Sequence, residues 1–156
     1  MRSRLIALVA VAGPLAGAAA GCGGTNSISK AELIRKGDAR CAQDSRRINA
    51  IPQPRFSPQS ATRARLPQAA SYLAKVNPIQ KSEIEYLRGL GEPTEGQKQW
   101  KAILADAGEV AAALEEAEDA AKDGNATRFK AQFKKLERSN FDQLARQFGF
   151  RECGQG

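Results

Sequence analysis

The chain has no histidine, and its only methionine is the initiator Met1. Histidine is the usual general base near neutral pH and the commonest metal ligand, and histidine and methionine are frequent axial ligands of haem. The composition therefore argues against catalysis by a histidine base, against a histidine-ligated metal and against haem. We expect no metal and no cofactor.

The sequence also lacks the common catalytic motifs. Serine, aspartate and lysine occur, but no G-x-S-x-G, S-x-x-K or glycine-rich phosphate loop surrounds them. Carboxylates do crowd one short stretch, and they are Glu109, Glu115, Glu116, Glu118 and Asp119. An acid–base or metal site would need such groups to face inward beside a partner such as histidine, whereas a solvated helix face needs neither. We predict that the protein is not an enzyme.

Long apolar runs are also scarce, and the single one lies at the start of the chain. Leu5 to Ala20 is apolar, but it is short for a membrane-spanning helix, which needs about 20 residues, and Gly13-Pro14 interrupts it. Arg2 and Arg4 precede the run, and Ala19-Ala20-Gly21-Cys22 ends it. This order of features predicts a secretory signal that finishes at a cysteine.

Residues 1–22 resemble the signal peptides of bacterial lipoproteins. Gly21 and Cys22 match the end of the lipobox and Ala20 is a usual occupant, while Ala19 stands where leucine is commoner. The resemblance implies that residues 1–21 are removed as a signal peptide and that Cys22 is lipidated. The protein would then be anchored on the extracytoplasmic face of the cell membrane.

Two alternatives to lipidation stay open. The alanines at 18–20 offer an A-x-A site, and cleavage after Ala20 would release a soluble protein with a free Cys22. The apolar segment can also remain uncut as an N-terminal anchor.

The mature chain is small and basic. Removal of residues 1–21 leaves 135 residues, enough for one domain with its own core. The precursor has 24 Lys and Arg against 17 Asp and Glu, and loss of Arg2 and Arg4 lowers the net charge from +7 to +5. Such a charge favours an anionic neighbour, either phospholipid headgroups or wall polymer. We expect no nucleic-acid partner, because the signal directs the chain away from it.

Helical signals begin after a polar tether at residues 22–28. Ser29 and Glu32 form a capping box, and Ile28 and Leu33 are spaced as a hydrophobic staple. Pro52 ends this first helix. Further helices are predicted over about 61–90, with Pro67 at its entry and a kink at Pro78; over about 95–122; and from a cap at Asn125 to Gly149.

The fold class predicted from these segments is all-α. Four helices with short links favour an antiparallel up-down four-helix bundle over residues 29–156. Apolar residues recur at helical spacing in each segment, and the aromatic ones gather in the last segment.

With Cys22 assigned to lipid, two cysteines remain. Cys41 and Cys153 in an exported protein are expected to form a disulfide. In up-down order Cys41 lies about 18 Å along the first helix, and the tail from Gly149 spans about 17 Å when extended, so the bridge is feasible. The alternative is two unpaired thiols, with Cys41 buried.

The first helix (SKAELIRKGDARC) and the chain's end (FGFREC) resemble small secreted or lipid-anchored helical proteins of actinobacteria. These motifs are short, and no functional residue is carried over from them.

Residues 46–81 contain basic side chains and no acidic one. We predict that this stretch contacts an anionic surface. The alternative is that these basic side chains only face water and keep the protein soluble. The candidate contact residues are Arg46, Arg47, Arg55, Arg63 and Arg65.

Two functional hypotheses follow. The first is a non-enzymatic envelope lipoprotein with a structural or protein-interaction role. The second is an extracytoplasmic module that binds a small apolar ligand, which a pocket lined by Trp100, Phe129 and Phe133 would favour.

Overall fold

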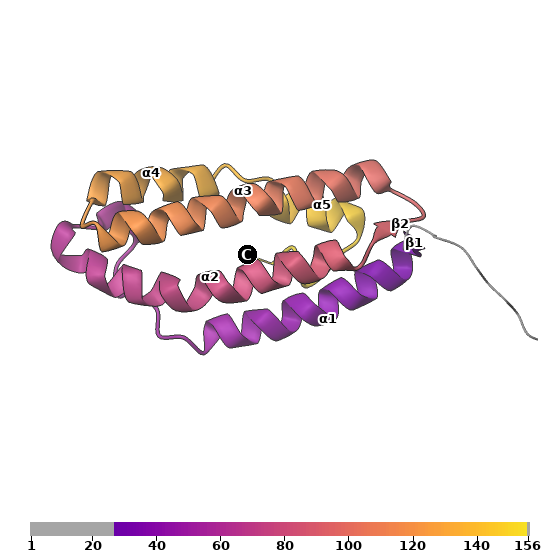
Figure 1. The fold of residues 1–156 in the computed structure, drawn as a ribbon, viewed down its shortest axis with the longest axis horizontal. Helices are drawn as coiled ribbons and strands as arrows, with labels where there is room; N and C mark the ends of the chain where they lie inside the picture. Colours follow the sequence, from indigo (N-terminus) through magenta and orange to yellow (C-terminus); the bar gives the residue numbers. More distant parts are fainter. Residues whose placement is uncertain (1–26, 156) are drawn as a thin grey trace, which may run out of the picture.

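The computed structural model describes residues 27–155, so Cys22 and the predicted signal peptide lie outside the described part (Figure 1). The long elements are helices. In chain order they are β1 (Ser27–Ile28), α1 (Lys30–Asn49), the 3₁₀ turns η1 (Pro58–Ser60) and η2 (Arg63–Arg65), α2 (Leu66–Gly89), β2 (Glu92–Pro93), α3 (Gln97–Lys122), α4 (Ala126–Leu136) and α5 (Phe141–Phe148).

The protein is all-α, and α3 is its central helix. α3 packs against α2, α4 and α5, and α1 packs against α2. Figure 1 shows an elongated body with the β1–β2 pair at one end and the start of α2 at the other. At 1.5 Å per residue the 26 residues of α3 span about 39 Å, so this helix runs most of the distance between those ends.

α1 begins at the predicted cap. The Ser29 hydroxyl accepts a hydrogen bond from the Glu32 backbone N–H at 3.2 Å, and Leu33 is fully buried with Ile28 packed against its cluster. The Glu32 carboxylate accepts two hydrogen bonds from Arg35, at 2.8 and 2.6 Å. Within the described residues the Glu32 carboxylate accepts no hydrogen bond from the Ser29 backbone N–H. Only the first of the two hydrogen bonds of a capping box is therefore present.

A short parallel pairing ties the start of the chain to the loop before α3. Ser27 and Ile28, which the sequence predicted to be the last residues of the tether, pair with Glu92 and Pro93. The Thr94 N–H also donates to the Ile28 carbonyl at 2.9 Å. Ser27 and Ile28 are therefore part of the folded body and not of a tether.

The second helix begins later than predicted. Residues 58–65 form two 3₁₀ turns, and α2 begins at Leu66 with Pro67 in its first turn, where the missing N–H of proline costs no helical bond. Pro78 lies inside α2, as predicted.

The prediction of one continuous final helix from Asn125 to Gly149 is wrong. α4 ends at Leu136 and α5 begins at Phe141. Asn125 caps α4 as predicted, and α5 ends as predicted at Gly149, whose φ of 117° is a left-handed value that favours glycine. The physical reason for the break is a contact with α3, described below.

The core consists of two clusters, one toward each end of the body. The first gathers around Trp100, Phe148 and Phe150, and the second around Leu66, Leu73 and Phe129. The central part of the bundle lies between them.

Candidate functional site

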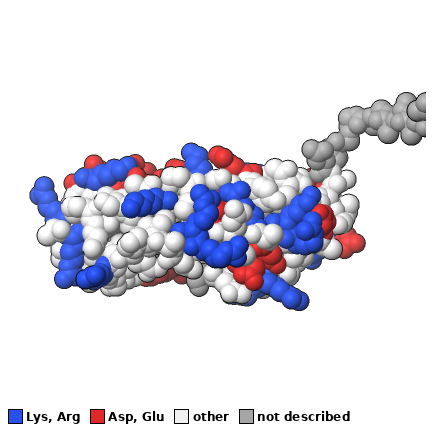
Figure 2. Space-filling view, turned by 90° about the horizontal axis from the view of Figure 1, so that it is seen from below, with Lys and Arg blue, Asp and Glu red and all other residues white. Residues whose placement is uncertain are grey.

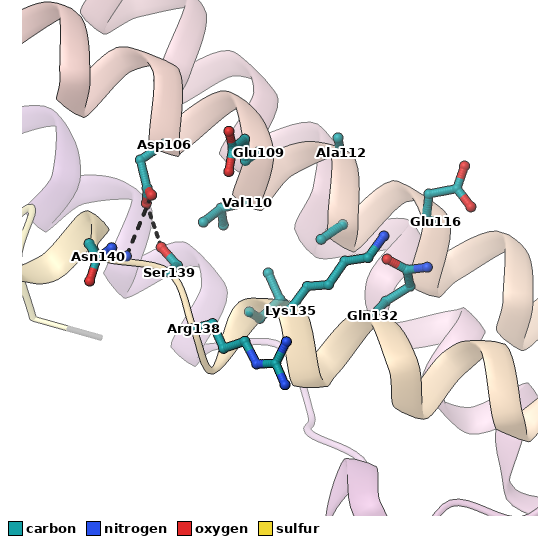
Figure 3. Close-up of a pocket in the computed structure, with 12 residues that line it drawn as sticks. Asp106, Glu109, Val110, Ala112, Glu116, Gln132, Lys135, Arg138, Ser139 and Asn140 are labelled. Atoms are coloured by element: carbon teal, nitrogen blue, oxygen red, sulfur yellow. Dashed lines mark hydrogen bonds between the residues drawn. The ribbon is translucent and has the colours of Figure 1, made fainter.

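A carboxylate on α3 stabilises the break between α4 and α5. Asp106 Oδ2 accepts a hydrogen bond from the Ser139 hydroxyl at 2.5 Å, and its Oδ1 faces the Asn140 N–H at 3.5 Å (Figure 3). Ser139 Oγ in turn accepts from the Phe141 N–H at 3.1 Å, which satisfies an amide at the start of α5. Asp106 therefore stabilises the interruption of the helix.

Two cavities flank this break, and they share Val110, Leu136 and Ser139 in their walls. The outer cavity, between α3 and α4, has a volume of about 470 Å³. In Figure 3, Lys135 and Gln132 extend from α4 toward α3, where Glu116 lies. The outer cavity combines both signs of charge, because Lys135 and Arg138 line it together with Asp106, Glu109 and Glu116.

The inner cavity lies on the other side of the break, in the middle of the bundle. Its volume is about 370 Å³, and α1, α2, α3, α5 and the C-terminal tail all contribute to its wall. The apolar lining includes Ile84, Val110, Leu114 and Phe141. A cavity of this size and composition is within the range of small-molecule sites.

Glu83 of α2 is a half-buried carboxyl group in the inner cavity. Burial, with a smaller contribution from the negative charge of Asp44, raises the pKa of Glu83 to about 7, while the positive charge of Arg40 acts in the opposite direction. Asp44 is fully buried, and its carboxylate is paired with Arg40 and, at 2.8 Å, with Arg47. Asp142 on α5 and Glu152 in the tail line the same cavity, and α3 contributes no charged group to it.

The raised pKa of Glu83 makes stability depend on pH. Between about 4.5, the ordinary value, and about 7, the folded chain keeps a proton that the unfolded chain has released, so stability falls as pH rises through this window. We expect the free energy of unfolding of Glu83→Gln, measured in urea, to exceed that of the wild type by on the order of 1–2 kcal/mol at pH 8. Near pH 4.5 the two free energies should be equal. Glu85→Gln, at an exposed position of α2, is the matched control. Parallel pH curves for wild type and Glu83→Gln would contradict the assignment.

Cys41 and Cys153 lie side by side. Their Cα atoms are 5.1 Å apart, and both residues are buried. Next to them is a residue that the sequence analysis missed. The carboxylate of Asp38 accepts hydrogen bonds from the backbone N–H groups of Arg151 at 3.0 Å, Glu152 at 2.8 Å and Cys153 at 3.4 Å. The available signal was its position three residues before Cys41, on the same helix face.

Three of the predicted basic residues, Arg55, Arg63 and Arg65, belong to segments at the end of the body away from Ser27, whereas Arg46 and Arg47 are in the last turn of α1, nearer the middle of the body. Arg63 lies against Gly124, just beyond the end of α3, and the Arg65 guanidinium stacks 5.9 Å from the Phe56 ring centroid. Figure 2 shows basic side chains at the end away from the grey trace. Arg47 is paired with Asp44, but among residues 27–155 no carboxylate lies within 4.0 Å of Arg46, Arg55, Arg63 or Arg65.

The three aromatic residues proposed to line one pocket do not all come together. Trp100 belongs to the first core cluster, is 2% exposed and donates from Nε1 to the Gly91 carbonyl at 3.1 Å. Phe129 and Phe133 pack against each other with tilted rings, 4.8 Å between centroids, and both line a cavity of about 190 Å³ that Trp100 does not reach. Trp100 is therefore a core residue.

The acidic residues of α3 form no metal site in the described part of the chain. No group of three or more Cys, Asp or Glu side chains there is arranged to hold an ion. Glu118 instead pairs with Lys122 at 2.6 Å and accepts a hydrogen bond from Asn77 at 2.6 Å, while Glu115 and Asp119 are exposed.

Between residues 27 and 155, no helix is long and apolar enough to cross a membrane. Comparison with known proteins found no matching family model, no matching curated protein and no matching solved structure.

Proposed function

We propose that the chain is a non-enzymatic lipoprotein of the extracytoplasmic face of the cell membrane, anchored through lipid on Cys22. Its contact surface is the distal basic end, defined as Arg55, Arg63 and Arg65. The observation that carries this proposal is that these three guanidinium groups have no carboxylate partner among the described residues and belong to segments at the opposite end of the body from Ser27. The partner is an anionic wall polymer.

The geometry favours wall polymer over headgroups. From Cys22 to Ser27 the chain spans at most about 17 Å, whereas α3 alone separates the two ends by about 39 Å. With the body upright on its anchor, the distal basic end lies several Debye lengths, about 8 Å each, from the membrane surface. Guanidinium groups bind phosphate oxygens in a bidentate manner, which suits a phosphate-bearing polymer.

The body that presents this surface is, in our proposal, an up-down antiparallel bundle closed by a Cys41–Cys153 disulfide. The short link between α3 and α4, Asp123 to Asn125, supports the reversal of direction there. The Cα separation of 5.1 Å lies within the range that a disulfide requires.

A second candidate function is the binding of a small ligand. One observation favours it, namely the inner cavity, which reaches between the two core clusters.

The charge of the distal basic end can be tested directly. We expect the triple variant Arg55→Gln, Arg63→Gln, Arg65→Gln to bind a poly(glycerol phosphate) polymer about tenfold more weakly than the wild type at low salt, because three charge contacts are lost. Binding is measured by calorimetry over a salt series.

The matched control removes the same charge near the other end, as Lys36→Gln, Lys98→Gln, Lys101→Gln, and should bind like the wild type. Vesicles with anionic lipid form a third arm of the experiment. Equal losses in both triple variants, or vesicle binding that exceeds polymer binding and depends on Arg55, Arg63 and Arg65, would overturn the choice of partner.

A further inference from the structure

The inner cavity has a one-sided charge. Its charged lining residues are Glu83, Asp142 and Glu152, all of them acidic. The chain as a whole has 24 Lys and Arg against 17 Asp and Glu, so an acidic lining runs against the composition. The outer cavity, by contrast, is lined by both basic and acidic side chains.

The cavity also holds an acceptor without a donor. The side-chain oxygen Oε1 of Gln80 is buried and has no hydrogen-bond partner among the described residues. A buried acceptor that is left unsatisfied destabilises the fold, so a ligand that donates to it gains affinity. Gln80 and Glu83 are three residues apart on α2 and both line the cavity, so the two side chains lie on one face of the helix.

Apolar side chains form the rest of the wall. Ile84 on α2, Val110 and Leu114 on α3, and Leu136 and Phe141 on either side of the helix break contribute to it. Access is from the rim, where Ser45, Glu152 and Gln155 are exposed. The wall therefore suits a ligand with an apolar body.

We infer that the inner cavity binds a small organic cation, a protonated amine with an apolar body. The ammonium group donates hydrogen bonds to Gln80 Oε1 and to the Glu83 carboxylate, and the body packs on Ile84, Val110 and Phe141. The inference rests on the second candidate function, the binding of a small ligand, and adds the chemical class of that ligand. It is independent of the distal basic end.

Three probes of similar size and different charge test it. 2-Phenylethylamine is a cation at pH 8, 2-phenylethanol is neutral and 3-phenylpropionate is an anion. Binding of each to the full chain is measured by calorimetry and by NMR shifts of the residues that line the cavity. We expect the amine to bind at least tenfold more tightly than the alcohol, and the propionate not to bind measurably.

Glu83→Gln keeps the shape of the side chain and removes its charge. We expect it to weaken amine binding by about tenfold and to leave the binding of the alcohol unchanged, while Glu85→Gln leaves both unchanged. If alcohol and amine bind equally, the cavity is a ligand site but the cation class is wrong. If none of the probes binds, or if their NMR shifts map outside the cavity, the ligand-binding function fails together with the inference.

Discussion

Replacing Cys41 and Cys153 together by alanine is expected to lower the free energy of unfolding by about 3–5 kcal/mol. The two residues are 112 positions apart, and a cross-link that closes so long a loop removes much of the conformational entropy of the unfolded chain. The proposed disulfide would also fasten the tail to α1, and with it Phe150, which is 3% exposed in the first core cluster. For a domain of this size the loss is a large share of the total stability.

Urea unfolding of the wild type with and without reductant, and of the double variant, measures this effect. The reduced wild type should unfold close to the double variant, and a Cys22→Ser variant should match the oxidised wild type. Alkylation of denatured, unreduced protein should leave Cys41 and Cys153 unmodified. Modification of both residues without reduction would show that the disulfide does not form.

Substitution of Cys22 by serine is expected to abolish lipid labelling and to move the protein from the membrane fraction to the aqueous fraction. Acyl chains contribute about 0.8 kcal/mol per buried CH₂, and they supply the anchor in our proposal. Cells fed a palmitate analogue should label the wild type and the Cys41→Ala, Cys153→Ala variant, but not Cys22→Ser.

An unlabelled wild type would contradict the lipid anchor, and the fractions then separate the alternatives. A soluble protein that begins at Gly21 would indicate cleavage after Ala20. A membrane-bound protein that still carries its first 20 residues would indicate an uncut anchor.

Helix ends were predictable from the sequence because their causes are local. Ser29, Asn125 and Gly149 each act on backbone groups within about four residues, and each is an end in the structure. The break after Leu136 was not predictable in this way. It depends on a hydrogen bond between Ser139 and Asp106, which are 33 residues apart, and on the gain of packing α5 into the first core cluster.

The cavity residues could be placed only in part. Helical periodicity correctly predicts that Ile84 and Leu114 face inward. It does not reveal whether the side chains on facing helices fill the space between them. The same limit explains Trp100 and Phe129. Both were correctly expected to be inward, yet they lie in separate clusters, because Trp100 is in the first turn of α3 and Phe129 is in α4, which begins beyond the other end of α3.

The hydrogen bonds of the Asp38 carboxylate bear on which two cysteines form a disulfide. If the chain is exported, as we propose, its three cysteines allow three pairings when they oxidise at random. The hydrogen bonds that Asp38 accepts from the amides of residues 151–153 involve no sulfur, so we expect them to hold the tail beside α1 in the reduced chain as well. Cys153 would then lie close to Cys41, and Cys22 would stay available for the acylation that we propose.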